Sequence, residues 1–135
     1  MAGHLIRRLH QHATQVFQER MQAAGFDLTA VQFIALDAIA LQPGIDQASL
    51  AATISFDRAT IGGVVDRLEQ KALLQRSVSV HDRRARQLHL TTEGKRLLKA
   101  SRPVVEALQA DILAPLSAAQ RAAFLALALK ALGLG

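Results

Sequence analysis

The chain has 135 residues, half of them hydrophobic, with a net charge of +5 and no cysteine. This length supports a single domain, residues 1–135, with a sizeable core, while the lack of cysteine excludes disulfides, thiol nucleophiles and thiolate metal ligands. Charged residues interrupt the apolar segments near both ends, so we expect no signal peptide, no membrane span and a cytoplasmic location.

The positive charge is unevenly distributed. Residues 57–102 contain 11 of the 16 lysines and arginines but only 5 of the 11 aspartates and glutamates. Such a concentration is the electrostatic footprint of a protein that binds a phosphate backbone. An ordinary solvated surface is the alternative that charge alone leaves open.

Two helices are expected before residue 45. Residues 5–24 place apolar side chains at spacings of three and four, the pattern of an amphipathic helix, and Gly25 ends it. Thr29 is a suitable N-cap for a second helix, which ends before Pro43 and Gly44. We expect the buried stripe of this second helix to consist of Ile34, Ala35, Ala38, Ile39 and Leu41.

A helix-turn-helix is expected next. Asp46 and Asp57 can each cap a helix, because a short side-chain oxygen there accepts hydrogen bonds from backbone N–H groups that lack a helical partner. Only residues 54–56 separate the two helices, so they must cross steeply. In a helix-turn-helix the second helix enters the major groove of DNA. The apolar residues expected to pack in the crossing are Leu50, Ala51, Ile54, Ile61, Val64, Val65 and Leu68.

A β-hairpin is expected after the helix-turn-helix. Apolar and polar residues alternate there, which is typical of strands with one buried face, formed here by Val78, Val80, Leu88 and Leu90. Residues 81–86 make the tip, which carries three arginines, Arg83, Arg84 and Arg86. A two-stranded ribbon is only marginally stable alone, so it must lean on the preceding helices, which places the arginines beside the second helix of the helix-turn-helix.

Two helices complete the chain. Thr91 caps a long helix that reaches about Leu113 and contains Pro103, and Ser117 with Gln120 makes a capping box for a last helix. The last helix is apolar nearly all round, which is typical of a buried helix. The middle of the chain is too small to bury the first and the last two helices. We therefore expect these helices to pack against a second copy of the chain.

The segment DRATIGGVVDRLEQKALLQRSVSVHDRRARQLHLTTEG, residues 57–94, resembles the MarR family of winged-helix transcriptional regulators. It matches the family's recognition helix, its D-x-R-[AS] wing at residues 82–85 and its L-T-x-x-G motif at residues 90–94. One position departs from the pattern, since Ala72 stands where glycine usually provides a left-handed helix end. Ala72 must either adopt positive φ or leave the helix differently.

The resemblance extends over essentially the whole chain and implies a mainly α fold. It implies a winged helix-turn-helix lobe at residues 28–100, with a two-stranded wing, and dimerisation helices at residues 1–27 and 101–135. It also implies a homodimer that binds a pseudo-palindromic operator in double-stranded DNA, usually as a repressor. Members of the family are often released from DNA by a small phenolic or aromatic carboxylic ligand.

The resemblance also indicates which residues contact DNA. Arg84 is expected to enter the minor groove, where negative potential attracts a guanidinium, and Arg83 and Arg86 are expected to contact phosphates. Positions of the second helix free to face the major groove are Arg58, Ala59, Thr60, Gly62, Gly63 and Arg67. Ser55 and Thr60 can donate hydroxyl hydrogen bonds to phosphates, although capping is a competing role.

The consecutive glycines of this helix allow two interpretations. Each glycine destabilises a helix by about 1 kcal/mol relative to alanine. Gly62 and Gly63 can allow the backbone to approach bases or phosphates closely, or they can relieve packing against another helix. The two interpretations remain open at this point.

Histidines and arginines of the first helix are the candidates for ligand binding. Arg8, His10 and His12 can meet an anionic ligand between the dimerisation helices and the DNA-binding lobe, where the family binds its effectors. His10 and His12 are two residues apart on a helix and point to different faces, so a metal site is not expected. No catalytic motif or cofactor-binding motif is present, so we expect no enzyme. The alternative functions are a protein-interaction module and a nonspecific architectural DNA binder.

Overall fold

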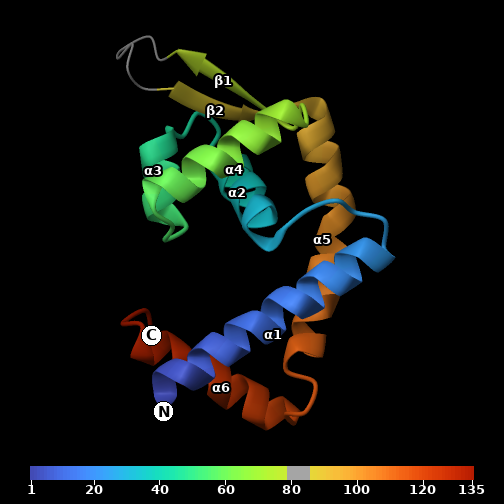
Figure 1. The fold of residues 1–135 in the computed structure, drawn as a ribbon, viewed down its shortest axis with the longest axis vertical. Helices are drawn as coiled ribbons and strands as arrows, with labels where there is room; N and C mark the ends of the chain where they lie inside the picture. Colours follow the sequence, from blue (N-terminus) through green and yellow to red (C-terminus); the bar gives the residue numbers. More distant parts are fainter. Residues whose placement is uncertain (79–85) are drawn as a thin grey trace.

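A computed structural model of the chain describes residues 1–78 and 86–135. The fold is mainly α, with six helices and one hairpin in the described residues, as expected (Figure 1). α5 runs between a lobe built from α2, α3, α4 and the hairpin and an opposite end where α1 and α6 lie (Figure 1). The elements are α1 Ala2–Ala23, α2 Ala30–Leu41, α3 Gln47–Thr53, α4 Arg58–Gln70, β1 Leu74–Val78, β2 Arg86–Leu90, α5 Thr92–Ile112 and α6 Ala118–Ala131.

Side-chain caps fix where five of the helices begin. In each case the cap residue has extended backbone dihedral angles, and its side-chain oxygen accepts from the backbone N–H three residues later. The caps are the predicted residues Thr29, Asp46, Asp57, Thr91 and Ser117. Thr29 and Ser117 also form complete capping boxes, because glutamine three residues later bonds back to the cap backbone.

The core lies inside the lobe and extends along α5 to the second half of α1. The predicted crossing of α3 and α4 is confirmed, since Leu50, Ile61 and Leu68 are fully buried. The expected stripe of α2 is wrong at Ile34 and Leu41, which are 42% and 77% exposed. Ile34 faces a cavity, and Leu41 is the last residue of α2, beyond the reach of the core.

The hairpin is antiparallel, with Leu74 opposite Leu90 and Val78 opposite Arg86. Its inner face differs from the prediction. Val78 is more than half exposed, whereas Leu74 and Leu88 are buried. The reason is that β1 begins at Leu74, so the buried end of the strand is the one nearest α4, and Val78 lies where β1 runs out beyond the helices. Val80 and residues 81–85 of the predicted tip lie outside the described residues.

A third short segment joins the hairpin beside β2. The backbone N–H of Gly44 donates to the carbonyl of Leu88, and the N–H of Leu88 donates to the carbonyl of Ile45, both at 2.9 Å. These bonds attach the loop before α3 to the middle of β2, so β2 is held to the segment that leads into the helix-turn-helix.

The start of α5 is packed tightly against the end of α4. Ala72 has a φ of 59°, so it adopts the left-handed conformation that glycine would accept more readily. Its carbonyl accepts from Oγ1 of Thr91 at 2.7 Å, and the carbonyl of Leu73 accepts from the N–H of Thr91 at 3.1 Å. A Cβ on Gly94 would lie only 2.0 Å from the Leu73 carbonyl oxygen. The L-T-x-x-G motif is thus a packed corner that requires its glycine.

α1 and α6 leave a large apolar surface exposed. No residue of α6 is buried, although the helix is apolar on nearly every side. The exposed side chains of the two terminal segments include Leu5, Ile6, Leu9, Leu125, Leu127, Leu129, Leu132 and Leu134. Among the described residues, no helix combines the length and the apolar character that a membrane crossing requires.

Candidate nucleic-acid interface

One face of α4 is directed away from the core. Ile61, Val65 and Leu68 point inward and are buried. The residues predicted to face a groove lie on the rest of the helix, where all are exposed except the half-buried Gly62, namely Arg58, Ala59, Thr60, Gly62, Gly63 and Arg67. The structure therefore brings these six residues together on one accessible surface of the lobe.

The consecutive glycines are not required by packing within the chain. A Cβ added at Gly63 would meet no heavy atom within 4 Å. One added at Gly62 would meet only Nε2 of Gln47, at 3.4 Å, and that atom is the end of a flexible side chain. Packing of α4 against other helices of the chain therefore does not explain the glycines. Of the two interpretations, the one that remains is that the glycines allow a ligand to approach the backbone closely.

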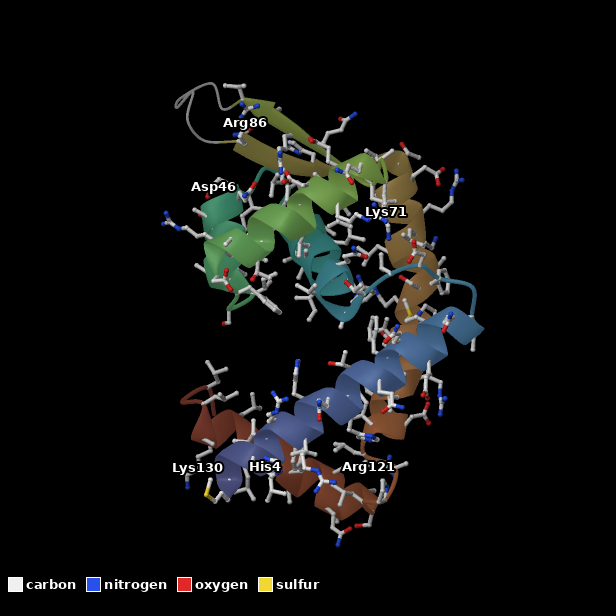
Figure 2. The ribbon with its side chains drawn as sticks, in the orientation of Figure 1. His4, Asp46, Lys71, Arg86, Arg121 and Lys130 are labelled. Carbon is white, nitrogen blue, oxygen red and sulfur yellow. The ribbon has the colours of Figure 1, made fainter. Side chains whose placement is uncertain are left out.

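Ion pairs divide the basic segment into two groups. Four of its basic residues are paired with carboxylates: Lys71 with Asp27, Arg76 with Asp66 and Glu69, Arg96 with Glu93, and Arg102 with Asp37. The other described basic residues of the segment are exposed and make no ion pair with any residue in the described part of the chain: Arg58, Arg67, Arg86, Lys95 and Lys99. Arg86 lies at the start of β2, on the same side of the lobe as the cap residue Asp46 (Figure 2). The positive charge available to a ligand is thus smaller than the sequence suggested, and in the described residues it lies on α4, at the start of β2 and on the first half of α5.

The turn between α3 and α4 is shaped by Ser55 and by the cap of α4. Ser55 has a φ of 60° and is exposed. Oγ1 of Thr60 donates to Oδ2 of Asp57 at 2.7 Å, so the Thr60 hydroxyl hydrogen has a capping partner. The Thr60 hydroxyl was predicted to donate to a phosphate, and to do so it must give up its hydrogen bond to Asp57.

Two carboxylates near this surface are stabilised in their charged form. The backbone N–H of Thr60 donates to Asp57 and lowers the pKa of its carboxyl group, with a further contribution from the Thr60 hydroxyl. The backbone N–H of Ser49 likewise lowers the pKa of Asp46, in spite of some desolvation. Both aspartates are therefore charged caps at neutral pH, and their charges are partly satisfied by helix N-termini.

The remaining predicted wing residues, Arg83 and Arg84, lie outside the described residues. Arg86 is the only one of the three wing arginines that the structure describes. The strands that lead to Arg83 and Arg84 emerge beside α4 (Figure 1). The expected contacts of Arg83 and Arg84 with DNA therefore stay predictions.

A cavity of about 660 Å³ lies between α2 of the lobe and the helices α1 and α5. Its walls come from α1, α2, α5 and the turn at Phe56, and they are mainly apolar. They are lined by His10, Ala13, Thr14, Phe17, Thr29, Ala30, Val31, Phe33, Ile34, Phe56, Val105, Gln109 and Ile112. The volume is within the range of about 300 to 1,000 Å³ that is usual for small-molecule sites.

Only one of the three predicted ligand-binding residues lines this cavity. His10 does so, whereas Arg8 is exposed elsewhere on α1. Nε2 of His12 lies 2.9 Å from the backbone carbonyl oxygen of Ile112, so His12 links α1 to the end of α5. Sequence reasoning missed Gln109, whose polar side chain reaches the cavity from α5. The sequence did contain an indication of this: Gln109 lies three residues before the apolar Ile112 on an amphipathic helix, so the two side chains share a face.

Known proteins resemble this chain along nearly its whole length. A profile of the MarR family matches residues 26–85. The HTH-type transcriptional repressor NicR of Pseudomonas putida is 37% identical over 123 residues, which is 91% of this chain and 77% of NicR. The chain belongs to the MarR family. It is a transcriptional regulator of that family, whose named relatives are regulators and not enzymes.

Solved MarR-family structures have the same fold. BpsR of Bordetella bronchiseptica superposes with a TM-score of 0.88 and 32% identity, over 96% of this chain and 91% of that one, in a study of how 6-hydroxynicotinic acid regulates DNA binding by BpsR. A variant of MarR from Escherichia coli, in complex with operator DNA, superposes with a TM-score of 0.87 and 27% identity, over 96% and 92% of the two chains. In the described part of this MarR-family chain, no three His, Asp or Glu side chains lie together as metal ligands would.

Proposed function

We propose that this chain is a homodimeric repressor that binds a pseudo-palindromic operator through α4 and the hairpin wing. The observation that carries the proposal is the outer surface of α4, where Gly63 leaves the backbone open and Arg58 and Arg67 are unpaired among the described residues. A helix face with an uncovered backbone can approach base edges in the major groove, while the guanidinium groups on either side of it can bind the phosphates along the groove. The complex of the E. coli MarR variant with operator DNA supports operator binding by a protein of this fold.

The proposed contacts have different consequences for specificity and for salt dependence. Ala59, Thr60, Gly62 and Gly63 face base edges, while Arg58, Arg67, Arg83 and Arg86 contact phosphates together with Ser55. Arg84 enters the minor groove. Loss of one phosphate contact reduces the slope of log affinity against log salt by about 1. Loss of Arg84 instead reduces the preference for a narrow minor groove.

The proposed dimer is formed by residues 1–27 and 101–135, with residues 28–100 as the DNA-binding lobe. The exposed leucines of α1 and α6 support it, because an apolar helix without buried residues is not stable in water by itself. Two lobes fixed by such a core would present their α4 helices to half-sites about 34 Å apart, one turn of DNA.

The cavity is the proposed effector site. Its aromatic walls fit a small aromatic or phenolic acid, and His10, Thr14 and Gln109 are the polar groups available to orient one. Arg8 and His12 do not reach this cavity within one chain, so His10 is the member of the predicted set that we retain for direct contact. A ligand there lies between α2 of the lobe and α1 and α5, so it would change the separation of the lobes and thereby weaken DNA binding.

The test is enrichment of duplexes from a random DNA library by the purified protein, with the DNA upstream of its own gene included. The proposal predicts an enriched motif with two inverted half-sites, and release of that duplex by an aromatic acid, with 6-hydroxynicotinic acid as the first probe. Enrichment of no duplex, with weak and equal binding to all, would indicate an architectural binder or a protein-interaction module in place of the repressor.

A further inference from the structure

Arg76 points toward α4. It lies in β1 opposite Leu88 of β2 and two residues after the buried Leu74, so its side chain emerges on the inner face of the hairpin. The Arg76 side chain is 22% exposed, compared with 60% for Asp66 and 44% for Glu69. An inward strand position is usually apolar, and a charged residue there needs a partner. Arg76 therefore differs from the exposed arginines with which the sequence groups it.

The guanidinium of Arg76 binds two carboxylates of α4 at the same time. Nη2 donates to Oδ1 of Asp66, and Nη1 lies 3.7 Å from Oε1 of Glu69. Asp66 and Glu69 are three residues apart, so they share one face of α4. Only a planar guanidinium offers two terminal nitrogens in a fixed fork, and the single ammonium of lysine does not. The geometry is thus specific for arginine.

The third donor of the same guanidinium has no partner. Nε of Arg76 is buried and makes no hydrogen bond within the described part of the chain. A buried donor without a partner is unfavourable, and such exceptions in a folded protein call for an explanation. Here the explanation is that both terminal nitrogens are directed to α4, which leaves Nε without an acceptor.

The two carboxylates lie next to the surface that is proposed to face DNA. Asp66 follows Gly62 by four residues and Gly63 by three, so it is one turn along the same side of α4. Unpaired carboxylates at this place would repel the phosphates of an approaching duplex. The positive charge of Arg76 offsets part of their negative charge, and because Arg76 belongs to β1, the same contact fixes the hairpin to α4.

We propose that Arg76 is a positioning residue for DNA binding. It fixes the angle between the hairpin wing and α4, and it reduces the negative charge of Asp66 and Glu69 beside the DNA surface, without contacting DNA itself. This inference rests on the proposed function, because it assigns a role within the same interface.

The experiment compares two backgrounds on a duplex enriched by the wild-type protein. Arg76→Gln is made in the wild-type chain and in a chain that carries Asp66→Asn and Glu69→Gln. In the wild-type background we expect Arg76→Gln to weaken binding about tenfold with an unchanged salt slope, and in the second background less than about twofold, because its partners are already gone.

A direct phosphate contact by Arg76 would give a different result and would overturn the inference. Arg76→Gln would then weaken binding equally in both backgrounds and reduce the salt slope by about 1. A merely structural role would also overturn it: the melting temperature would fall, while affinity measured well below the melting temperature would stay unchanged. Failure of the wild-type protein to enrich any duplex would contradict the proposed function, a result distinct from either of these.

Two further variants keep the test interpretable. Arg76→Lys retains the charge but not the fork, so it should fold if Arg76→Gln does not, and we expect it to bind more weakly than wild type by at least about threefold. Wild-type affinity for Arg76→Lys would show that charge alone is sufficient and would contradict the positioning role. Arg96→Gln removes an exposed ion pair with Glu93 on α5 and is the matched control, with an expected change below about twofold.

Discussion

The same substitution, glycine to alanine, should have opposite effects on stability at two helical positions. At Gly94 the new Cβ would lie 2.0 Å from the carbonyl oxygen of Leu73 and 3.0 Å from its carbonyl carbon. Both atoms belong to the backbone, and the oxygen also accepts from the N–H of Thr91, so relief requires α5 to move away from the end of α4. At Gly63 the new Cβ meets no heavy atom within 4 Å.

The magnitudes follow from two opposing terms. Overpacking against a rigid neighbour destabilises by up to about 3 kcal/mol, and at Gly94 we expect the upper end of that range. Replacing glycine inside a helix contributes about 1 kcal/mol of stability at either site. The net expectation is a loss of about 2 kcal/mol for Gly94→Ala and a gain of about 1 kcal/mol for Gly63→Ala.

Thermal unfolding followed by circular dichroism measures both variants. At about 4 °C per kcal/mol for a domain of this size, the melting temperature should fall by about 8 °C for Gly94→Ala and rise by about 4 °C for Gly63→Ala. The protein concentration must be equal in all samples, because dimerisation contributes to apparent stability. A Gly94→Ala variant as stable as wild type would refute the packed corner, and a destabilised Gly63→Ala variant would refute the open surface of α4.

Three further results are expected. Ala72→Gly should raise the free energy of unfolding by up to about 1 kcal/mol, since it removes left-handed strain of about 1 to 2 kcal/mol but makes the unfolded chain more flexible; urea titration checks it. Folding lowers the pKa values of Asp46 and Asp57, so the two carboxylates stabilise the fold above pH 3.8, and this stabilisation is lost as the pH falls below it. The melting temperature should therefore fall less steeply with acid in Asp57→Asn than in wild type, and an equally steep fall would contradict this. Gly63→Ala should weaken operator binding although it stabilises the fold, and unchanged affinity in a fluorescence titration would rule out close approach at that position.

Local signals in the sequence were sufficient to predict where the helices begin. Asp46, Asp57 and Thr91 cap helices at the predicted places, because a cap depends on a side chain and a backbone N–H only three residues away. The alternation of apolar and polar residues predicted the hairpin and the burial of Leu88, which is buried. It also predicted the burial of Val78, which is exposed. Whether a strand residue is covered depends on where the neighbouring helix ends, which the period-two pattern does not contain.

The site was predictable in its outline but not in its electrostatics. Composition identified residues 57–102 as basic, and helical periodicity placed Arg58 and Arg67 on the free face of α4. The pairing of Arg76 with α4 depends on a strand that returns beside the helix, so counting charges could not distinguish it from Arg86. The lining of the cavity proposed as an effector site was only partly predictable, because its walls come from three helices and a turn that are distant along the chain.

Sequence preference in DNA binding is the central claim, and a pair of binding curves tests it most directly. The affinity of the purified protein should be measured at physiological salt for an enriched duplex and for a shuffled duplex of equal length, with Arg84→Ala alongside. We expect the enriched duplex to bind at least about a thousandfold more tightly, and Arg84→Ala to lose a substantial part of that preference. Equal affinity for the two duplexes would contradict the account, whatever the absolute strength of binding.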